Sequence, residues 1–325
     1  MVRISTIVIL LGCTLIVACA KQHDTREMAV QEWYLWTDDG VRHYVAEIGH
    51  GPTVVVLHGG WGAEHSYLLD LVKPLGDRIE FVLYDQRGSL RSPAPADTLS
   101  LNRLVADLEE LRREVGGEKL ALLTHSMGSQ LAYAYLKQHP NRVRALVMLS
   151  AVLPEDADTD DELAARAQQD FVHFAQENEA RQVELEKLGG KAWERLTDKE
   201  KSARNQISFA SGNIVHIARW RQVRGGQAFY DGQVHSRLLE NTPPGDWAGL
   251  FGALRDNAPF VHLIMGDHDL VDFGLVAWPR LASTLPNASL TRIEQAGHNA
   301  WIDQPADVEA ALARALAGAF ADPSH

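Results

Sequence analysis

The sequence predicts an α/β protein with a mostly parallel sheet of eight strands, helices on both faces, and a helical insertion. Short, continuous apolar runs such as Thr53–Leu57 are typical of strands that are buried on both faces. Segments of helical length alternate with these runs, which is the pattern of parallel strands joined by crossover helices. Between Pro154 and Trp247 the alternation stops, and helical patterns follow one another without a strand.

The individual elements follow from the same patterns, taken in chain order. Two strand-like runs, 33–37 and 41–48, are joined by Asp38-Asp39-Gly40, and an Asp-Gly turn between such runs is a good hairpin signal. Further strands are expected at 53–57, 81–84, 120–123, 145–149, 260–264 and 289–293. Helices are expected near 64–76, 99–115, 127–139 and 272–284, and from 306 to about 320.

The insertion, 154–247, is expected to be a helical cap between two parts of one core, 30–153 and 248–325. Its first long helical run ends at Gly189-Gly190, a typical C-terminal stop. Thr197 and Glu200 have the spacing of a capping box at the start of another helix.

Composition limits the possible classes of function. A chain of 325 residues with 46% apolar content can bury a full core and an accessory region. The formal charge of −12 and the pI near 5.6 argue against a nucleic-acid partner, which requires clustered Lys and Arg.

The N-terminal segment is predicted to be an export signal of the lipoprotein type, 1–18, followed by a tether, 19–29. Arg3 precedes an apolar run that is short for a membrane span. The small and aliphatic residues before Cys19 resemble a bacterial lipobox, so we expect lipid on Cys19; Cys13 is a weaker candidate. The alternatives are an ordinary signal cut near Ala20 or an uncleaved anchor.

The lipobox resemblance implies a protein anchored to a bacterial membrane and facing the periplasm. The outer membrane is slightly favoured, because Ala20 stands where a retention signal would place aspartate. Both cysteines lie within residues 1–19, so neither disulfides nor cysteine catalysis are expected.

The strongest chemical signal is Ser126, which stands at a predicted strand-to-helix turn and has the pattern of a nucleophile elbow. Asp269 follows the strand at 260–264, and His298 follows the strand at 289–293. The order Ser, Asp, His at strand ends predicts a catalytic triad. Ser126 could instead merely start a helix, and Asp267 and Asp272 compete with Asp269 for the role of the acid.

A tetrahedral intermediate requires aimed backbone donors. We expect these donors to be Met127, which follows the nucleophile, and Gly60 in the glycine-rich loop after the strand at 53–57; Trp61 is the next choice. The histidines and acids show no ligand spacing, so no metal or other cofactor is expected.

With these motifs the chain resembles the α/β-hydrolase superfamily and, within it, the proline iminopeptidase group. His58–Gly62 resembles the family's His-Gly-Gly-Pro-Gly, and Tyr84–Ser92 resembles its Asp-Gln-Arg-Gly-Ser-Gly-x-Ser segment. Trp61 replaces a proline, Leu90 a glycine, and Thr124 the first glycine of the elbow.

The resemblance implies an aminopeptidase that releases N-terminal proline or another small residue through an acyl-enzyme. In this group acidic cap residues hold the substrate amine, and no segment of this cap matches that pattern cleanly. The alternatives are an esterase, lactonase or amidase acting on small acyl substrates and, from another class, a non-catalytic binding lipoprotein.

Overall fold

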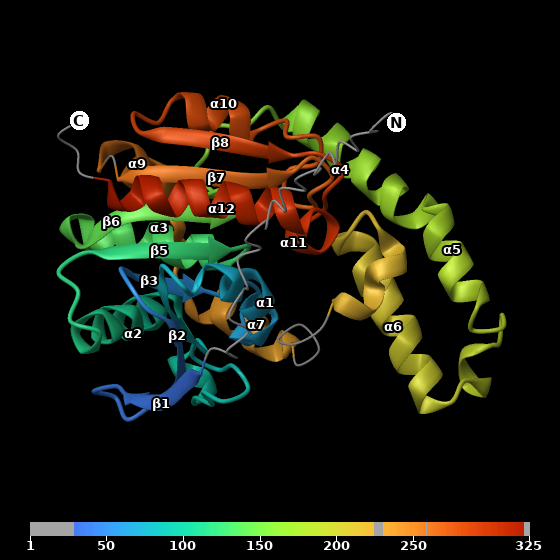
Figure 1. The fold of residues 1–325 in the computed structure, drawn as a ribbon, viewed down its shortest axis with the longest axis horizontal. Helices are drawn as coiled ribbons and strands as arrows, with labels where there is room; N and C mark the ends of the chain where they lie inside the picture. Colours follow the sequence, from blue (N-terminus) through green and yellow to red (C-terminus); the bar gives the residue numbers. More distant parts are fainter. Residues whose placement is uncertain (1–28, 224–229, 258, 322–325) are drawn as a thin grey trace, which may run out of the picture.

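The computed structural model describes residues 29–223, 230–257 and 259–321. One eight-stranded sheet, in the order β1-β2-β4-β3-β5-β6-β7-β8, forms the body of the protein (Figure 1). β2 pairs antiparallel with both of its neighbours, β1 and β4, and all the other neighbouring strands pair in parallel, which confirms the predicted fold class. The predicted signal, Cys13 and Cys19 lie outside the described residues.

All eight strands occur where the apolar runs predict them. They are β1 Val30–Trp36, β2 Arg42–Gly49, β3 Thr53–Leu57, β4 Glu80–Tyr84, β5 Leu120–His125, β6 Val143–Leu149, β7 Phe260–Gly266 and β8 Ala288–Ile293. The turn between β1 and β2 closes with a bond from Gly40 N to Thr37 O, and Gly40 has a φ of +82°. Glycine is favoured there because a side chain is strained at positive φ.

Helices cover both faces of the sheet, as the parallel pattern requires. On one face lie α2 Leu101–Glu114, α3 Gly128–Gln138, α9 Leu250–Asp256 and α10 Trp278–Ser283. On the other face lie α1 Leu69–Val72, α11 Ala300–Asp303 and α12 Pro305–Phe320. Single turns of 3-10 helix occur at His65–Leu68, Lys73–Leu75, Ala96–Thr98 and Pro140–Arg142. Within the described residues, no helix is both long and apolar enough to span a membrane.

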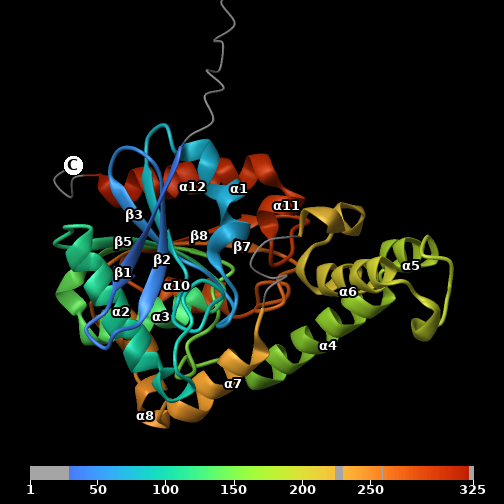
Figure 2. The same cartoon turned by 90° about the horizontal axis from the view of Figure 1, so that it is seen from below.

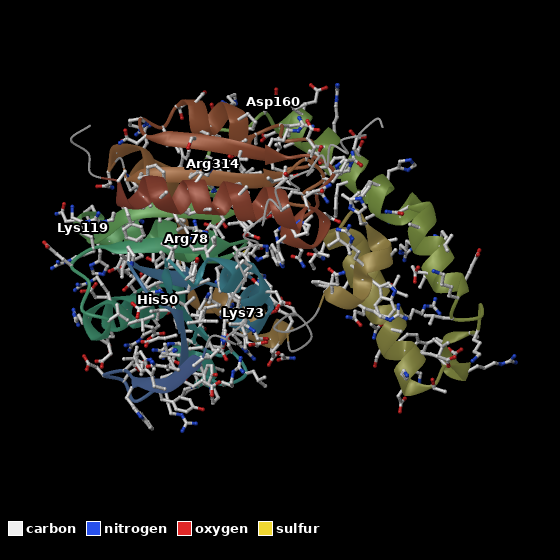
Figure 3. All side chains as sticks on the ribbon, in the orientation of Figure 1. His50, Lys73, Arg78, Lys119, Asp160 and Arg314 are labelled. Carbon is white, nitrogen blue, oxygen red and sulfur yellow. The ribbon has the colours of Figure 1, made fainter. Side chains whose placement is uncertain are left out.

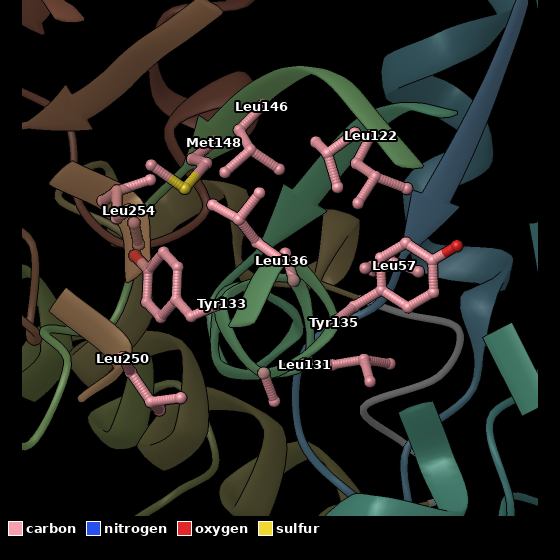
Figure 4. Packing of buried hydrophobic residues seen from close by; sticks show 14 of the residues in the cluster. Leu57, Leu122, Leu131, Tyr133, Tyr135, Leu136, Leu146, Met148, Leu250 and Leu254 are labelled. Atoms are coloured by element: carbon pink, nitrogen blue, oxygen red, sulfur yellow. The ribbon is translucent and has the colours of Figure 1, made fainter. Parts of the chain in front are cut away.

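The core on the α3 face holds the Ser126 end of the sheet in place. Leu57 of β3 and Leu122 of β5 pack with Leu131 and Leu136 of α3 (Figure 4), and each is less than 1% exposed. Burying one such side chain contributes about 1.5–3 kcal/mol. The strand-to-helix turn at Ser126 is therefore anchored on both sides.

The helix expected near 272–284 is shorter than the apolar pattern suggests. Its N-terminus is displaced to Trp278 because the Asp272 carboxylate accepts the backbone N–H groups of Val276, Ala277 and Trp278. Because the Asp272 side chain caps these three N–H groups, Asp272 lies in the loop before the helix and not within the helix.

The insertion contains two groups of helices. The first group, α4 Asp161–Glu177, α5 Glu179–Glu186 and α6 Asp198–Asn213, projects from one side of the body (Figures 1 and 2). The second group, α7 Gly232–Asn241 and α8 Pro244–Trp247, lies against the α3 face, where Leu238 and Trp247 join its core cluster. Turns of 3-10 helix occupy Trp193–Arg195 and Ile217–Gln222.

Local capping explains where the projecting helices begin. Asp160, labelled in Figure 3, accepts from Leu163 N at the start of α4, and Asn178 separates α4 from α5. At the start of α6, Thr197 and Glu200 form the predicted capping box. The base of α6 rejoins the body through Ile207 and Ala210.

Candidate active site

Ser126 occupies a strained turn between β5 and α3. Its φ is +53°, a conformation that costs a non-glycine residue free energy and occurs at functional turns. A Cβ at Gly128 would lie 2.3 Å from Leu57 O, and a Cβ at Gly59 would lie 2.6 Å from Ser126 Cβ. Only glycine at these two positions lets strand, helix and loop approach closely enough to form the turn.

Asp269 is the acid that contacts His298. Asp269 Oδ1 lies 2.7 Å from His298 Nδ1 and also accepts from Val271 N. The two rival acids have other partners: Asp267 contacts His268 and Arg292, and Asp272 caps the start of α10. The structure therefore separates three acids that the sequence placed in one loop.

Burial and charge act in opposite directions on the Asp269 carboxyl. Complete burial raises its pKa, but the charge of His298 and its hydrogen bond outweigh burial and lower the pKa below the usual value. Asp269 therefore stays ionised at neutral pH and holds a proton on Nδ1 of His298. In the neutral ring, this tautomer leaves Nε2 of His298 without a proton, as a general base requires.

Ser126 and His298 line the same cavity, whose volume is about 240 Å³. Its walls come from the loop after β3, the end of α6 and the segment before α7. The apolar part of the lining consists of Ala63, Phe209, Tyr230 and Leu270. The lining residues, all from the described part of the chain, include no carboxylate.

The loop after β3, His58–Gly62, lies beside Ser126 and is called the oxyanion loop below. Gly59 N donates to Tyr67 Oη at 2.7 Å, so this N–H is already occupied. Gly60, with a φ of +67°, and Met127, at the start of α3, have N–H groups for which the described residues provide no hydrogen-bond acceptor. These two groups can receive an oxygen that develops negative charge.

Trp61 connects the oxyanion loop to the second helix group. Its ring lies 5.4 Å from that of His235 in α7 and 5.5 Å from that of Trp247 in α8. The carbonyl of Gly62 accepts from Asp231 N at 2.9 Å. The segment before α7 is thereby fixed against the loop.

The Asp-Gln-Arg-Gly segment supports the same end of the sheet. Asp85 Oδ1 accepts from His65, and Asp85 Oδ2 accepts from Arg91 Nε at 2.9 Å. Arg87 is buried and binds Asp107 and Asp39. These are charge-assisted bonds within the protein, so both residues of the motif stabilise the turn.

Glu64, His65 and Asp85 form the one group of potential metal ligands within the described residues. The Arg91 guanidinium binds both carboxylates of this group. A cation of the protein thus already pairs with both carboxylates and balances one of their two negative charges.

A comparison with known families decides the family of the chain. Residues 52–305 match the family model described as the alpha/beta hydrolase fold. The chain belongs to the α/β-hydrolase fold family. In this fold, a serine at a strand-to-helix elbow is followed along the chain by an acid and then by a histidine. Ser126, Asp269 and His298 have this order.

Individual relatives of this α/β hydrolase match shorter segments. A proline iminopeptidase of Saccharolobus solfataricus is 38% identical over 107 residues, which cover 32% of this chain and 34% of the relative. A putative 2-succinyl-6-hydroxy-2,4-cyclohexadiene-1-carboxylate synthase of Bacillus subtilis is 36% identical over 115 residues, covering 34% and 42%. The matched segments thus span only about a third to two fifths of these relatives.

A solved structure extends the similarity of fold to nearly the whole hydrolase. An alpha/beta fold family hydrolase from Bacillus anthracis superposes with a TM-score of 0.65 at 15% identity, covering 89% of this chain and 99% of the other. At this identity the likeness concerns the fold alone.

Sequence reasoning missed Tyr67 and His125, which contact the site without belonging to its motifs. Tyr67 Oη lies 2.8 Å from His125 Nδ1, and both residues line the cavity. The available signal was weak: His125 directly precedes Ser126, and Tyr67 lies in an ordinary amphipathic segment.

Proposed function

We propose that this protein is a serine hydrolase in which Ser126, His298 and Asp269 form the catalytic triad. The observation that carries the proposal is the pairing of His298 with a buried, ionised Asp269 at the cavity that Ser126 lines. A serine hydroxyl is a weak nucleophile until an oriented base accepts its proton.

In the proposed mechanism, Ser126 Oγ attacks the substrate carbonyl carbon while its proton passes to Nε2 of His298. Asp269 stabilises the imidazolium that forms, and the N–H groups of Gly60 and Met127 bind the oxyanion. His298 then gives the proton to the leaving group, and an ester to Ser126 remains. Water, deprotonated by His298, releases the acyl group by the same steps in reverse.

The cavity supports a small, uncharged acyl group as the substrate portion beside Ser126. Phe209, Tyr230 and Leu270 offer apolar surface, and the described lining offers no carboxylate to pair with an ammonium ion. Burying an unpaired charge in such a cavity would be costly. We therefore place esters or amides of small neutral acids first.

The similarity to proline iminopeptidases supports a second candidate, an aminopeptidase that releases N-terminal proline or a small residue. The apolar cavity would accommodate a pyrrolidine ring. This candidate requires an acceptor for the substrate amine, which the described lining would have to supply through carbonyl or hydroxyl oxygens.

Labelling with a fluorophosphonate probe tests the hydrolase proposal. We expect the wild type to be labelled at Ser126, and Ser126→Ala to be unlabelled although folded. Ser202→Ala, which changes an exposed serine in α6, is the matched control and should keep its label. A folded wild type that resists labelling would favour the non-catalytic binding alternative.

Two paired substrates separate the two substrate classes. Prolyl p-nitroanilide carries a free amine, whereas p-nitrophenyl butyrate presents a neutral acyl group to the same machinery. We expect a higher kcat/KM for the ester and an improved kcat/KM for longer acyl chains in Phe209→Ala. Efficient turnover of the anilide, lost on N-acetylation, would instead establish the aminopeptidase.

We also propose that the mature protein is held at a bacterial membrane by lipid on Cys19, facing the periplasm. The proposal rests on the lipobox-like residues before Cys19. Cys19→Ala should move the protein from the membrane fraction to the soluble fraction, whereas Cys13→Ala should leave it in place. An unchanged distribution of Cys19→Ala would refute lipidation at this residue.

A further inference from the structure

A continuous chain of hydrogen bonds runs from the oxyanion loop to the backbone of His298. Gly59 N donates to Tyr67 Oη, and Tyr67 Oη lies 2.8 Å from His125 Nδ1. On the other side of the imidazole ring, His125 Nε2 lies 3.2 Å from the carbonyl oxygen of His298. The mechanism described above uses neither Tyr67 nor His125.

The direction of every bond in this chain follows from the partners at its ends. A carbonyl oxygen can only accept, so the proton of a neutral His125 must be on Nε2. His125 Nδ1 is then an acceptor and receives the Tyr67 hydroxyl proton. The Tyr67 oxygen in turn accepts the N–H of Gly59. Every donor in this chain of hydrogen bonds therefore faces an acceptor.

Both side chains are in the protonation states that this direction requires. His125 is 2% exposed; its burial, and secondarily the charge of His298, lower its pKa to about 3. His125 is therefore neutral at neutral pH. Burial raises the pKa of Tyr67 far above neutrality, so its hydroxyl keeps the proton that it donates.

The carbonyl of His298 receives a second donor from the neighbouring strand. Ser150, at the end of β6 with a φ of +50°, donates from Oγ to His298 O at 2.8 Å. The end of β5 thus supplies one donor and the end of β6 the other. Together they fix the main chain that carries the proposed base.

We propose that Tyr67 and His125 are positioning residues that keep the oxyanion loop, the elbow and the His298 loop in register. The proposal rests on the proposed function, because it assigns His298 and the oxyanion loop their roles in acyl transfer. Ser126 directly follows His125, so one imidazole ring touches all three parts of the site. A displacement of about 1 Å between such parts can cost about 100-fold in rate.

Tyr67→Phe is the sharpest perturbation, because it removes one hydroxyl and keeps the packed ring. We expect kinact for fluorophosphonate labelling to fall about 10- to 100-fold, with KI changed less than about threefold. Tyr133→Phe is the matched control: it removes another buried hydroxyl, which donates to Val152 O and not to a residue of the hydrogen-bond chain described here. It should lose similar stability and label at the wild-type rate.

Two substitutions at His125 separate the two halves of the chain. The amide nitrogen of Gln reaches the place of Nε2, so His125→Gln retains the donor to His298 O. The shorter His125→Asn can meet Tyr67 but not His298 O. His125→Gln keeps the donor to His298 O but loses the acceptor for Tyr67, so we expect a defect similar to that of Tyr67→Phe; His125→Asn, which loses the donor to His298 O, should show a defect at least as large.

Nitrogen-15 NMR of labelled histidines gives a readout that does not depend on turnover. The signal lost in His125→Asn should show the Nε2–H tautomer, remain neutral down to about pH 4, and change in Tyr67→Phe. An Nδ1–H tautomer, equal labelling rates in Tyr67→Phe and wild type, or an equal defect in Tyr133→Phe would overturn the proposal. If the folded wild type is not labelled at all, the proposed function fails, and the tautomer alone decides whether the hydrogen-bond chain exists.

Discussion

Replacing Asp269 with Asn tests the assignment of the acid most directly, because two other acids occupy the same loop. Asp269 Oδ1 accepts from both His298 Nδ1 and Val271 N, so the amide oxygen of Asn should take this place. The amide nitrogen then takes the position of Oδ2, which has no hydrogen-bond partner among the described residues. The correct tautomer of His298 is therefore retained, and the change that affects His298 is the loss of the negative charge.

The size of the loss follows from Coulomb's law. An Nδ1–Oδ1 distance of 2.7 Å places the centres of the two charged groups about 4 Å apart. At an effective dielectric constant of about 20, their attraction is about 4 kcal/mol in the transition state, when His298 is positively charged. Since about 1.4 kcal/mol corresponds to a factor of ten, kcat/KM should fall about 1,000-fold.

The assay is hydrolysis of a chromogenic short-chain ester, with thermal unfolding as the test of an intact fold. Asp267→Asn is the control: Asp267 contacts His268 and Arg292 and has no contact with His298, so its kcat/KM should change less than about threefold. A folded Asp269→Asn variant that keeps more than a tenth of the activity would refute the reasoning. So would an equal loss in Asp267→Asn.

Two further predictions concern stability, measured as the free energy of unfolding in urea. Gly128→Ala should lose about 2–3 kcal/mol, because its Cβ would lie 2.3 Å from a backbone oxygen. The control, Gly252→Ala in α9, has open space around the new Cβ and should gain about 0.5–1 kcal/mol. Similar values for the two variants would contradict the close-approach argument. The hydrogen bond from Arg112, opposed by burial, lowers the pKa of Glu109 to about 2. Since this pKa is lowered in the folded state, the stabilisation is present above about pH 4.5 and is lost as the pH falls towards 2. Glu109→Gln should therefore cost about 2 kcal/mol at pH 7 and much less at pH 3, whereas the exposed Glu114→Gln should change little at either pH.

The sheet and the elbow were predictable because their determinants are local in sequence. Strands buried on both faces require continuous apolar runs, and a sharp strand-to-helix turn requires small residues at fixed positions around Ser126. The carboxyl ends of parallel strands share one edge, so Ser126, Asp269 and His298 could be expected to lie near one another. The cavity that Ser126 and His298 line, with Asp269 bonded to His298, agrees with that expectation.

Other features depend on contacts that no short segment of sequence records. Asp267, Asp269 and Asp272 differ in role only because Val271 N holds one carboxylate towards His298 and the start of α10 captures another. The pairing of Tyr67 with His125 joins residues 58 positions apart and arises from packing beneath the oxyanion loop. A buried tyrosine and a histidine beside a nucleophile are each too common to predict such a bond.

The substitution of Trp61 for the family's proline links the oxyanion loop to substrate specificity. Trp61 packs on α7 and α8, and Gly62 O accepts from Asp231 N. Tyr230 precedes Asp231 in the chain, so this bond also keeps Tyr230 close to the oxyanion loop. The Tyr230 ring approaches within 3.7 Å of the place where a Cβ on Gly60 would lie, and it also lines the cavity. The wall that meets the acyl group and a proposed oxyanion donor therefore belong to one packed unit. A substrate that displaces Tyr230 must also disturb Gly60, so poor fit in the cavity should reduce kcat as well as raise KM.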